Sequence, residues 1–154
     1  MHDLEVMEVR VDAAGGSPVV VLREAGGDRL LPVWMSAAGA AAIVSATEEP
    51  DELRPCVHDL VAALIATSGS QLEEVRLTEY VEGQFFAELA FGERTVPARP
   101  SDAIAIALRL GCPIRCAEEV LRDAGVGPAA QDEVDRFREF LDNVSPDDFQ
   151  PPPE

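Results

Sequence analysis

The segment that follows Arg99 constrains the fold most, because it predicts a helix that is apolar on almost every side. Pro100 suits the first turn of a helix, where a missing N–H loses no hydrogen bond, and Gly111 is a typical helix stop. Between them, residues 103–108 are only alanine, isoleucine and leucine. A helix without a polar face has to be buried between other elements. We therefore expect residues 100–110 to form the central helix of the domain.

Alternating apolar and polar residues predict strands before and after this helix. The first three strands are separated by glycine-containing turns, which is typical of an antiparallel meander, and Pro32 places the third at a sheet edge or a bulge. Glu82-Gly83 predicts a tight hairpin between two longer strands. The expected strands cover residues 7–11, 19–22, 30–35, 72–81, 84–91, 95–98 and a short stretch around Ile114.

Three further helices are expected to pack against this sheet. Ser36 can cap the first, and Gly69 and Gly125 can end the other two. They cover residues 37–46, residues from His58 or Asp59 to Ser68, and residues 117–124. In the second of these helices, Leu60, Ala63, Leu64 and Thr67 share one face. The fold class that follows is α+β, with a mixed, mainly antiparallel sheet and packed helices.

The chain divides into one domain and a C-terminal extension. Residues 1–125 contain all the strands and the central helix, so they form the domain. Residues 126–144 are a linker and an amphipathic helix with Val134, Phe137, Leu141 and Val144 on one side. Residues 145–154 are acidic and rich in proline, which predicts a disordered tail.

Charge limits the choice of partners. The 154 residues include 29 acids and 12 basic residues, all of them arginine, for a net charge of −17. Tight, non-specific binding to nucleic acid depends on cationic side chains that neutralise phosphates, so this charge disfavours it. A local arginine cluster can still bind a phosphate. The N-terminal residues lack a basic and an apolar signal region, and no apolar run is long enough to span a membrane, so we expect a cytoplasmic protein without membrane contact.

The three cysteines give no metal or redox motif. In an extended chain Cys112 and Cys116 lie about 13 Å apart, too far for a disulfide. Cys56 is distant from both in the sequence. We interpret all three as small, buried apolar residues.

An ordered set of short motifs resembles the bifunctional nuclease family, a small α+β domain of bacteria and plants. The set covers about residues 4–125, and residues 145–149 resemble the tail of actinobacterial members. The resemblance implies the α+β fold, frequent homo-oligomers, and DNase and RNase activity. The motifs are Leu31-Pro32-Val33-Trp34-Met35, Arg54-Pro55, His58-Asp59-Leu60, Glu82-Gly83-Gln84-Phe85-Phe86-Ala87, Ala98-Arg99-Pro100-Ser101-Asp102-Ala103-Ile104-Ala105, Pro113-Ile114 and Glu118-Glu119-Val120-Leu121.

This chain departs from the family pattern at two positions. Gly39 stands where the pattern has glutamate, and Val57 stands where it has threonine. The first change removes a carboxylate, and the second removes a helix cap typically worth about 1 kcal/mol. If the missing glutamate is a metal ligand or a base in the family, the nuclease activity of this chain is impaired or lost. These changes indicate a divergent member of the family.

The polar motif positions supply the groups that phosphodiester hydrolysis requires. His58 and the carboxylates Asp59 and Asp102 are the candidate catalytic residues, and the two carboxylates are also the candidate ligands of a divalent metal, Mg²⁺ or Mn²⁺. Arg54, Arg99 and Ser101 are the candidate substrate-binding residues. Structural interpretations compete with these roles. His58 can be a helix-start or hydrogen-bonded structural residue, Asp59 a helix cap, and Asp102 a carboxylate of the first helical turn. Arg99 can pair with Asp102 or Asp59. Trp34 is interpreted as a core residue, with base stacking as the alternative.

Three functions remain open. The first is a metal-assisted nuclease acting on DNA or RNA. The second is a non-catalytic, oligomeric binding or regulatory module, which the charge and the changes at Gly39 and Val57 favour. Hydrolysis of a small phosphorylated metabolite is a third. The structure can separate an enzyme from the binding module. An enzyme is favoured if one concave pocket brings together the four residues His58, Asp59, Arg99 and Asp102. The binding module is favoured if each of them caps its own helix or forms a local pair.

Overall fold

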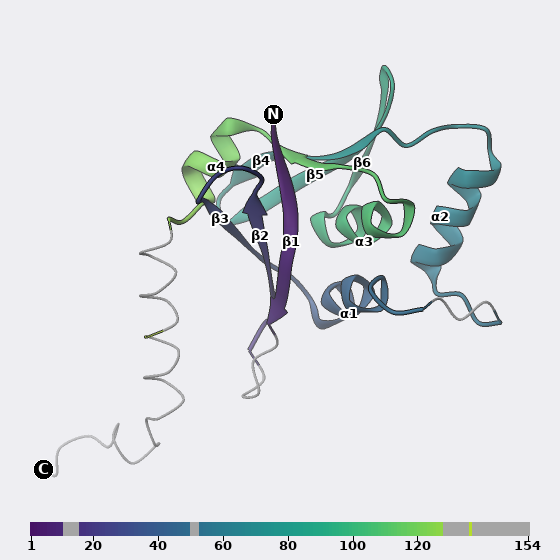
Figure 1. Ribbon diagram of the computed structural model, residues 1–154, viewed down its shortest axis with the longest axis horizontal. Helices are drawn as coiled ribbons and strands as arrows, with labels where there is room; N and C mark the ends of the chain where they lie inside the picture. Colours follow the sequence, from purple (N-terminus) through teal and green to yellow (C-terminus); the bar gives the residue numbers. More distant parts are fainter. Residues whose placement is uncertain (11–15, 50–52, 128–135, 137–154) are drawn as a thin grey trace, which may run out of the picture.

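A computed structural model describes residues 1–10, 16–49, 53–127 and Arg136 (Figure 1). The C-terminal helix and the tail expected from the sequence lie outside these residues, apart from Arg136. Val126, just past the expected end of the domain, exchanges backbone hydrogen bonds of 2.7 and 2.8 Å with Leu30. The chain is therefore still attached to the sheet at this point.

The described residues form one mixed sheet and four helices, which confirms the predicted α+β class. The sheet has seven strands in the order β3-β2-β1-β7-β4-β5-β6, and only the β4–β7 pair is parallel. The strands are β1 His2–Arg10, β2 Val19–Glu24, β3 Leu30–Trp34, β4 Glu74–Val81, β5 Gln84–Phe91, β6 Arg94–Ala98 and β7 Ile114–Cys116. The helices are α1 Ala37–Ser45, α2 Val57–Thr67, α3 Pro100–Leu110 and α4 Glu118–Ala124.

Helix α3 is the central helix, as its apolar sequence predicts. It contacts α1, α2 and the strands β4 and β5, so it lies between these two helices and the sheet (Figure 1). Its residues 103–107 are all buried. Gly111 ends the helix in the left-handed conformation, with φ +67°. Alanines at alternate positions keep the helix thin enough for neighbours to approach closely on several sides.

The short strand β7 joins the two halves of the sheet. It pairs antiparallel with the start of β1 and parallel with β4. Ile114 and Cys116 are buried while Arg115 between them is not, which is the alternation of a strand with two different faces. The predicted edge position of Pro32 is confirmed, since β3 is the last strand of the described sheet: it pairs with β2 on one side, and on the other Leu30 forms an isolated bridge with Val126.

The first strand and the second helix both begin earlier than predicted: β1 starts at His2, whereas the sequence predicted a strand from residue 7. In β1 a bulge between Val6 and Glu8 shifts the register, so Leu4 and Val6 face inward and Met7 is 50% exposed. Helix α2 begins at Val57, one residue before the earlier of the two predicted starts.

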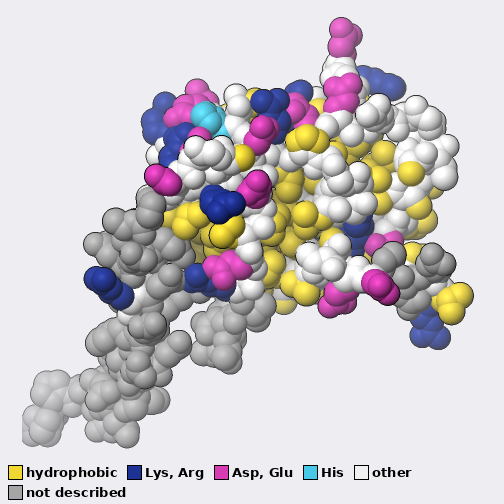
Figure 2. Space-filling view, in the orientation of Figure 1, with side chains coloured by type: hydrophobic (Ala, Val, Ile, Leu, Met, Phe, Trp, Pro, Cys, Tyr) yellow, Lys and Arg dark blue, Asp and Glu magenta, His cyan; other side chains and the backbone are white. Residues whose placement is uncertain are grey.

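On α2 the expected apolar face is only partly covered. Leu60 and Leu64 are 51% and 59% exposed, whereas Ala62 on another side is buried. Figure 2 shows hydrophobic side chains over the middle of this face of the molecule, with charged side chains above them, to the left and at the lower right. Within the described part of the chain, no helix is both long and apolar enough to cross a membrane.

Candidate functional site

Three polar residues from the family motifs meet where α2 and α3 begin. His58 lies in the first turn of α2, Arg99 is the N-cap of α3, and Asp102 lies in its first turn. The Asp102 Oδ1 atom is 2.8 Å from His58 Nε2 and accepts a 3.2 Å hydrogen bond from Arg99 Nη2. Its Oδ2 atom accepts a 2.7 Å bond from Arg99 Nε. One carboxylate therefore connects the imidazole and the guanidinium.

The electrostatics of this cluster keep Asp102 ionised. Partial burial raises the pKa of its carboxyl group, but the hydrogen bonds from Arg99 and His58 outweigh burial and hold that pKa below its usual value. Because the carboxylate only accepts hydrogen bonds, the hydrogen of the neutral imidazole is placed on Nε2. The His58 side chain is 16% exposed and that of Arg99 is 73% exposed. The guanidinium can therefore reach a ligand from solvent.

A second polar cluster is centred on Arg109, which lies in the last turn of α3 and whose side chain is only 7% exposed. Nε donates to Asp59 at 2.6 Å, and Nη1 donates to the carbonyls of Ala42 and Ala105. Nη2 donates to Ser45 Oγ and to Cys56 Sγ. Each of the five N–H groups of the Arg109 guanidinium therefore has an acceptor. This side chain connects the end of α1, the start of α2 and α3.

Asp59 is part of this cluster and not of the first. Its Oδ2 atom accepts a 2.9 Å hydrogen bond from the backbone N–H of Cys56, so it completes a capping box at the third position of α2. The hydrogen bond from Arg109 is the main reason why the pKa of Asp59 falls to about 2. This geometry explains why the helix starts before Asp59: the aspartate side chain bonds back to the residue that precedes the helix.

The candidate residues are therefore divided between two hollows. One of about 450 Å³ is lined by Arg54 and Asp59, with Glu48, Glu49 and Arg109. The other, of about 280 Å³, is lined by Arg99 and Ser101. His58 and Asp102 line neither of the two. The four residues do not converge in one concave pocket, and Asp59 caps its own helix, so by the criterion set from the sequence this part of the geometry favours the binding module. In favour of an enzyme, three of the four contact one another: His58, Arg99 and Asp102.

Two residues interpreted as buried are exposed. Trp34, at the end of the edge strand β3, is 57% exposed and lines the 280 Å³ hollow beside Arg99. Cys56 is exposed, whereas Cys112 is half-buried and Cys116 is buried. All three thiols are free, as expected from their spacing.

The carboxylates proposed as metal ligands do not fit a metal ion as they are placed. Asp59 uses both oxygens for Cys56 and Arg109, and Asp102 uses both for His58 and Arg99. The two carboxylates also belong to separate clusters, so they do not face one common ion position. Over the described ranges, no group of three or more His, Cys, Asp and Glu side chains could hold a metal ion.

Gly39 lies at the close approach of α1 and α3. A Cβ atom there would be 2.7 Å from the Cβ and 2.9 Å from the Oγ of Ser101, which is itself buried. The position at which the family pattern has glutamate has no room for a side chain in this molecule. The hydroxyl group of Ser101 therefore packs against α1, and Ser101 also forms part of the lining of the 280 Å³ hollow.

Arg109 is the residue that the sequence predictions missed. One signal in the sequence could have identified it: Arg109 is a charged residue in a helix that is otherwise expected to be buried on every side. A buried arginine requires several hydrogen-bond acceptors around it. Its partners come from positions separated by up to 67 residues in the chain, and no local pattern identifies them.

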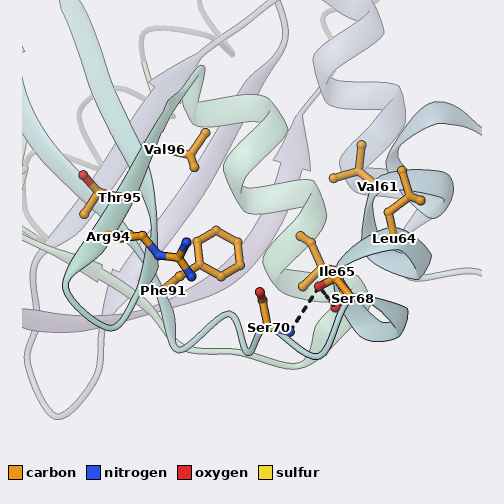
Figure 3. A pocket seen from close by; sticks show the side chains of 9 residues that line it. All are labelled: Val61, Leu64, Ile65, Ser68, Ser70, Phe91, Arg94, Thr95 and Val96. Carbon is orange, nitrogen blue, oxygen red and sulfur yellow. Dashed lines mark hydrogen bonds between the residues drawn. The ribbon is translucent and has the colours of Figure 1, made fainter.

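A separate apolar groove of about 650 Å³ lies between α2 and the β5–β6 hairpin. Figure 3 shows Val61, Leu64 and Ile65 of α2 on one side, with Phe91, Arg94 and Val96 on the other. Arg94 is the one charged side chain among the described lining residues. The groove shares no lining residue with the two polar hollows.

Comparison with known proteins agrees with the motifs. The model of the bifunctional nuclease domain matches residues 20–128. An uncharacterized protein of Mycobacterium tuberculosis is 44% identical over 97% of this chain and 99% of its own length. Bifunctional nuclease 2 of rice (Oryza sativa subsp. japonica) is 29% identical over 71% of this chain but 36% of its own length, and bifunctional nuclease 2 of Arabidopsis thaliana is 30% identical over 64% and 32%. The chain spans about a third of these plant proteins. With the domain model covering most of its length, the chain belongs to the bifunctional nuclease domain family.

Proposed function

We propose that this protein hydrolyses phosphodiester bonds of nucleic acid at the cluster formed by His58, Asp102 and Arg99. The observation that carries the proposal is the shared carboxylate: Asp102 bonds an imidazole on one helix and an exposed guanidinium on another. These are an acid–base group and a phosphate-binding group, each held in orientation. The relationship to proteins named bifunctional nucleases supports the same chemistry.

Each residue has a defined task in this proposal. With its hydrogen on Nε2 and bonded to Asp102, neutral His58 presents Nδ1 as the basic nitrogen, which can take a proton from an attacking water. Asp102 positions the imidazole and stabilises its protonated form. Arg99 uses Nε and Nη2 for Asp102. Its Nη1 amino group lies outside this pair and binds a phosphate oxygen, which stabilises the charge that develops there.

A divalent metal ion is given no step here, because the two carboxylates are each bound by an arginine. Arg54, from the same family motifs, lines the other hollow with Glu48 and Glu49. We assign it no task at the phosphate that Arg99 binds. Metal dependence is measured as a variable of the assay.

The test is a nuclease assay on purified protein with single-stranded DNA, duplex DNA and RNA, each with Mg²⁺, Mn²⁺ or a chelator. We expect His58→Ala and Asp102→Asn to lower the rate by about 10²-fold or more, the usual contribution of general acid–base catalysis. His2→Ala is the matched control: His2 contacts Glu24 and Glu118, far from this cluster. Equal cleavage by all variants would place the activity elsewhere or in a contaminant, and no cleavage in any condition would refute the proposal.

The apolar groove supports a second candidate, a non-catalytic module that assembles with itself. Leu60, Leu64 and Val96 are 51%, 59% and 48% exposed along α2 and β6. The α2 segment bears one carboxylate, Asp59, already paired. A mainly apolar face whose one charged residue in the described lining is Arg94 carries little of the net charge of −17, so contact with another copy meets the least repulsion there.

Light scattering after size exclusion tests this assembly. We expect an oligomer that Leu64→Glu converts to a monomer. Leu53→Glu is the control, because Leu53 is 92% exposed and lies outside the groove. A monomeric parent protein, or two variants that assemble equally, would refute self-association through this face.

A further inference from the structure

We propose that the 280 Å³ hollow beside Arg99 is a nucleobase-binding site in which a base stacks on Trp34, so that the substrate strand is single-stranded. This inference rests on the proposed function, because it extends the same site from the phosphate to the base. It gives Trp34 the alternative role considered for it from the sequence.

The exposure of Trp34 is the first observation behind this site. It ends β3, which is the edge strand of the sheet in the described part of the chain and pairs with β2. The side chain is 57% exposed, although tryptophan is among the residues with most to gain from burial. It lines a hollow together with Phe85, Gln84 and Arg99. An indole face beside a concave surface is the arrangement on which single-stranded nucleic-acid sites stack a base.

The polar groups around the hollow suit a nucleotide. Arg99 is 73% exposed and forms part of the lining, so a phosphate bound to its Nη1 amino group would lie next to a base on Trp34. The same arginine bonds Asp102, which holds His58. The base site is thus connected to the proposed acid–base group through two side chains. The exposed amide of Gln84 can both donate to and accept from a base edge.

The charge of the molecule favours a single strand. In a duplex both faces of each base are already stacked on neighbours, so Trp34 has no base face to contact. With a net charge of −17, the protein gains little from a long row of phosphates. Stacking of a base on Trp34 does not depend on the net charge of the protein. If Arg99 makes one phosphate contact, the slope of log affinity against log salt is about −0.7, much shallower than for proteins that bind many phosphates.

The experiment uses the fluorescence of Trp34, which is the single tryptophan of the chain. The probe is an oligothymidylate of about twelve nucleotides, within the usual size of single-strand sites. The full chain is titrated in chelator, once as the parent protein and once as His58→Ala, so that binding is read without cleavage. An abasic oligomer of the same length is the matched ligand, and free tryptophan corrects for absorbed light. We expect quenching by the oligothymidylate and little by the abasic strand.

Affinities of the variants are compared by anisotropy of a labelled oligothymidylate. Trp34→Ala should weaken binding by about 5- to 150-fold, the range for loss of one stacked base, and Trp34→Phe should recover part of the loss. Phe86→Ala is the control, since Phe86 is also an exposed aromatic, 47% exposed, but does not line the hollow. Circular dichroism checks that each variant is folded.

The outcomes separate this inference from the proposed function. Quenching without cleavage supports the base site and refutes the nuclease. Cleavage that is lost in His58→Ala but unchanged in Trp34→Ala, without base-dependent quenching, refutes the base site and leaves the nuclease standing. Equal quenching by the abasic strand also overturns stacking, as does tighter binding to a duplex of the same length.

Discussion

Gly39 on α1 lies against Ser101 on α3 so closely that a Cβ atom at position 39 would be 2.7 Å from that of the serine. The family pattern has glutamate at this position. In this chain the two helices have closed the space that such a side chain would use, with Ser36 Oγ capping α1 beside them through a 3.1 Å bond from the Gly39 amide. The close contact between α1 and α3 is possible because Gly39 has no side chain.

Restoring the family glutamate is therefore expected to destabilise the molecule. Gly39→Glu should lower the free energy of unfolding by about 1–3 kcal/mol, the cost of overpacking a closed contact, and should not raise nuclease activity. Ala41→Glu is the control in urea denaturation, because Ala41 is exposed on the same helix. A stable Gly39→Glu variant with increased cleavage would instead show that a catalytic carboxylate had been lost.

Arg109 should be the most sensitive polar position of the domain. Arg109→Met removes hydrogen bonds to five acceptors and leaves Asp59 unpaired, so we expect a loss of about 2–4 kcal/mol in the free energy of unfolding. Arg122→Met, which disrupts a surface pair with Asp123, should stay within about 0.5 kcal/mol. The measurement is urea denaturation at neutral pH. Similar losses in both variants would contradict the structural role of Arg109.

The pKa of Asp59 gives the protein a specific dependence on acid. The hydrogen bond from Arg109 lowers that pKa from 3.8 to about 2 in the folded state. Its stabilising effect is complete above the unfolded value and is lost as the pH falls through about 2. Parent protein and Asp59→Asn should therefore differ most in stability near neutral pH and converge between about pH 4 and pH 2. Asp123→Asn controls for the loss of one charge, and a gap that widens in acid would refute the assignment.

Local signals in the sequence predicted much of the fold. Helix α3 has proline at its start, glycine after its end and an apolar stretch between, and its predicted bounds match those of the structure. The β4–β5 hairpin follows from Glu82-Gly83 and the alternation on either side. A short strand around Ile114 was predicted and is found as β7, but its place between β1 and β4 depends on pairing across the whole chain.

The candidate site could be predicted only in part. His58, Arg99 and Asp102 were selected from motifs, and the structure joins them, while their catalytic roles stay predictions. Arg109 was missed because its acceptors come from three helices. Trp34 was interpreted as core because tryptophan usually is, and its exposure depends on β3 being the last strand of the sheet. A sequence alone does not tell which face of an edge strand is covered.

The three free thiols should differ strongly in reactivity. Burial raises the pKa of the Cys116 thiol to about 11 and also raises that of Cys112, whereas Cys56 is exposed beside Arg109. Because the thiolate is the reactive form, iodoacetamide at mildly alkaline pH should label Cys56 first and Cys116 only after unfolding. Mass spectrometry of the peptides gives the order. Rapid labelling of Cys116 in the folded protein would contradict its burial.

The β4–β5 turn can be improved by one substitution. Glu82 has φ +51°, the left-handed region, and is the one residue other than glycine with positive φ in the described ranges. Asparagine tolerates this conformation better, and Asn-Gly is the preferred pair for such a turn. Glu82→Asn should therefore stabilise the protein by about 0.5–1 kcal/mol, read as a higher melting temperature. Glu82→Gln removes the same charge without the conformational preference, so an equal gain in both variants would assign the effect to charge instead of backbone strain.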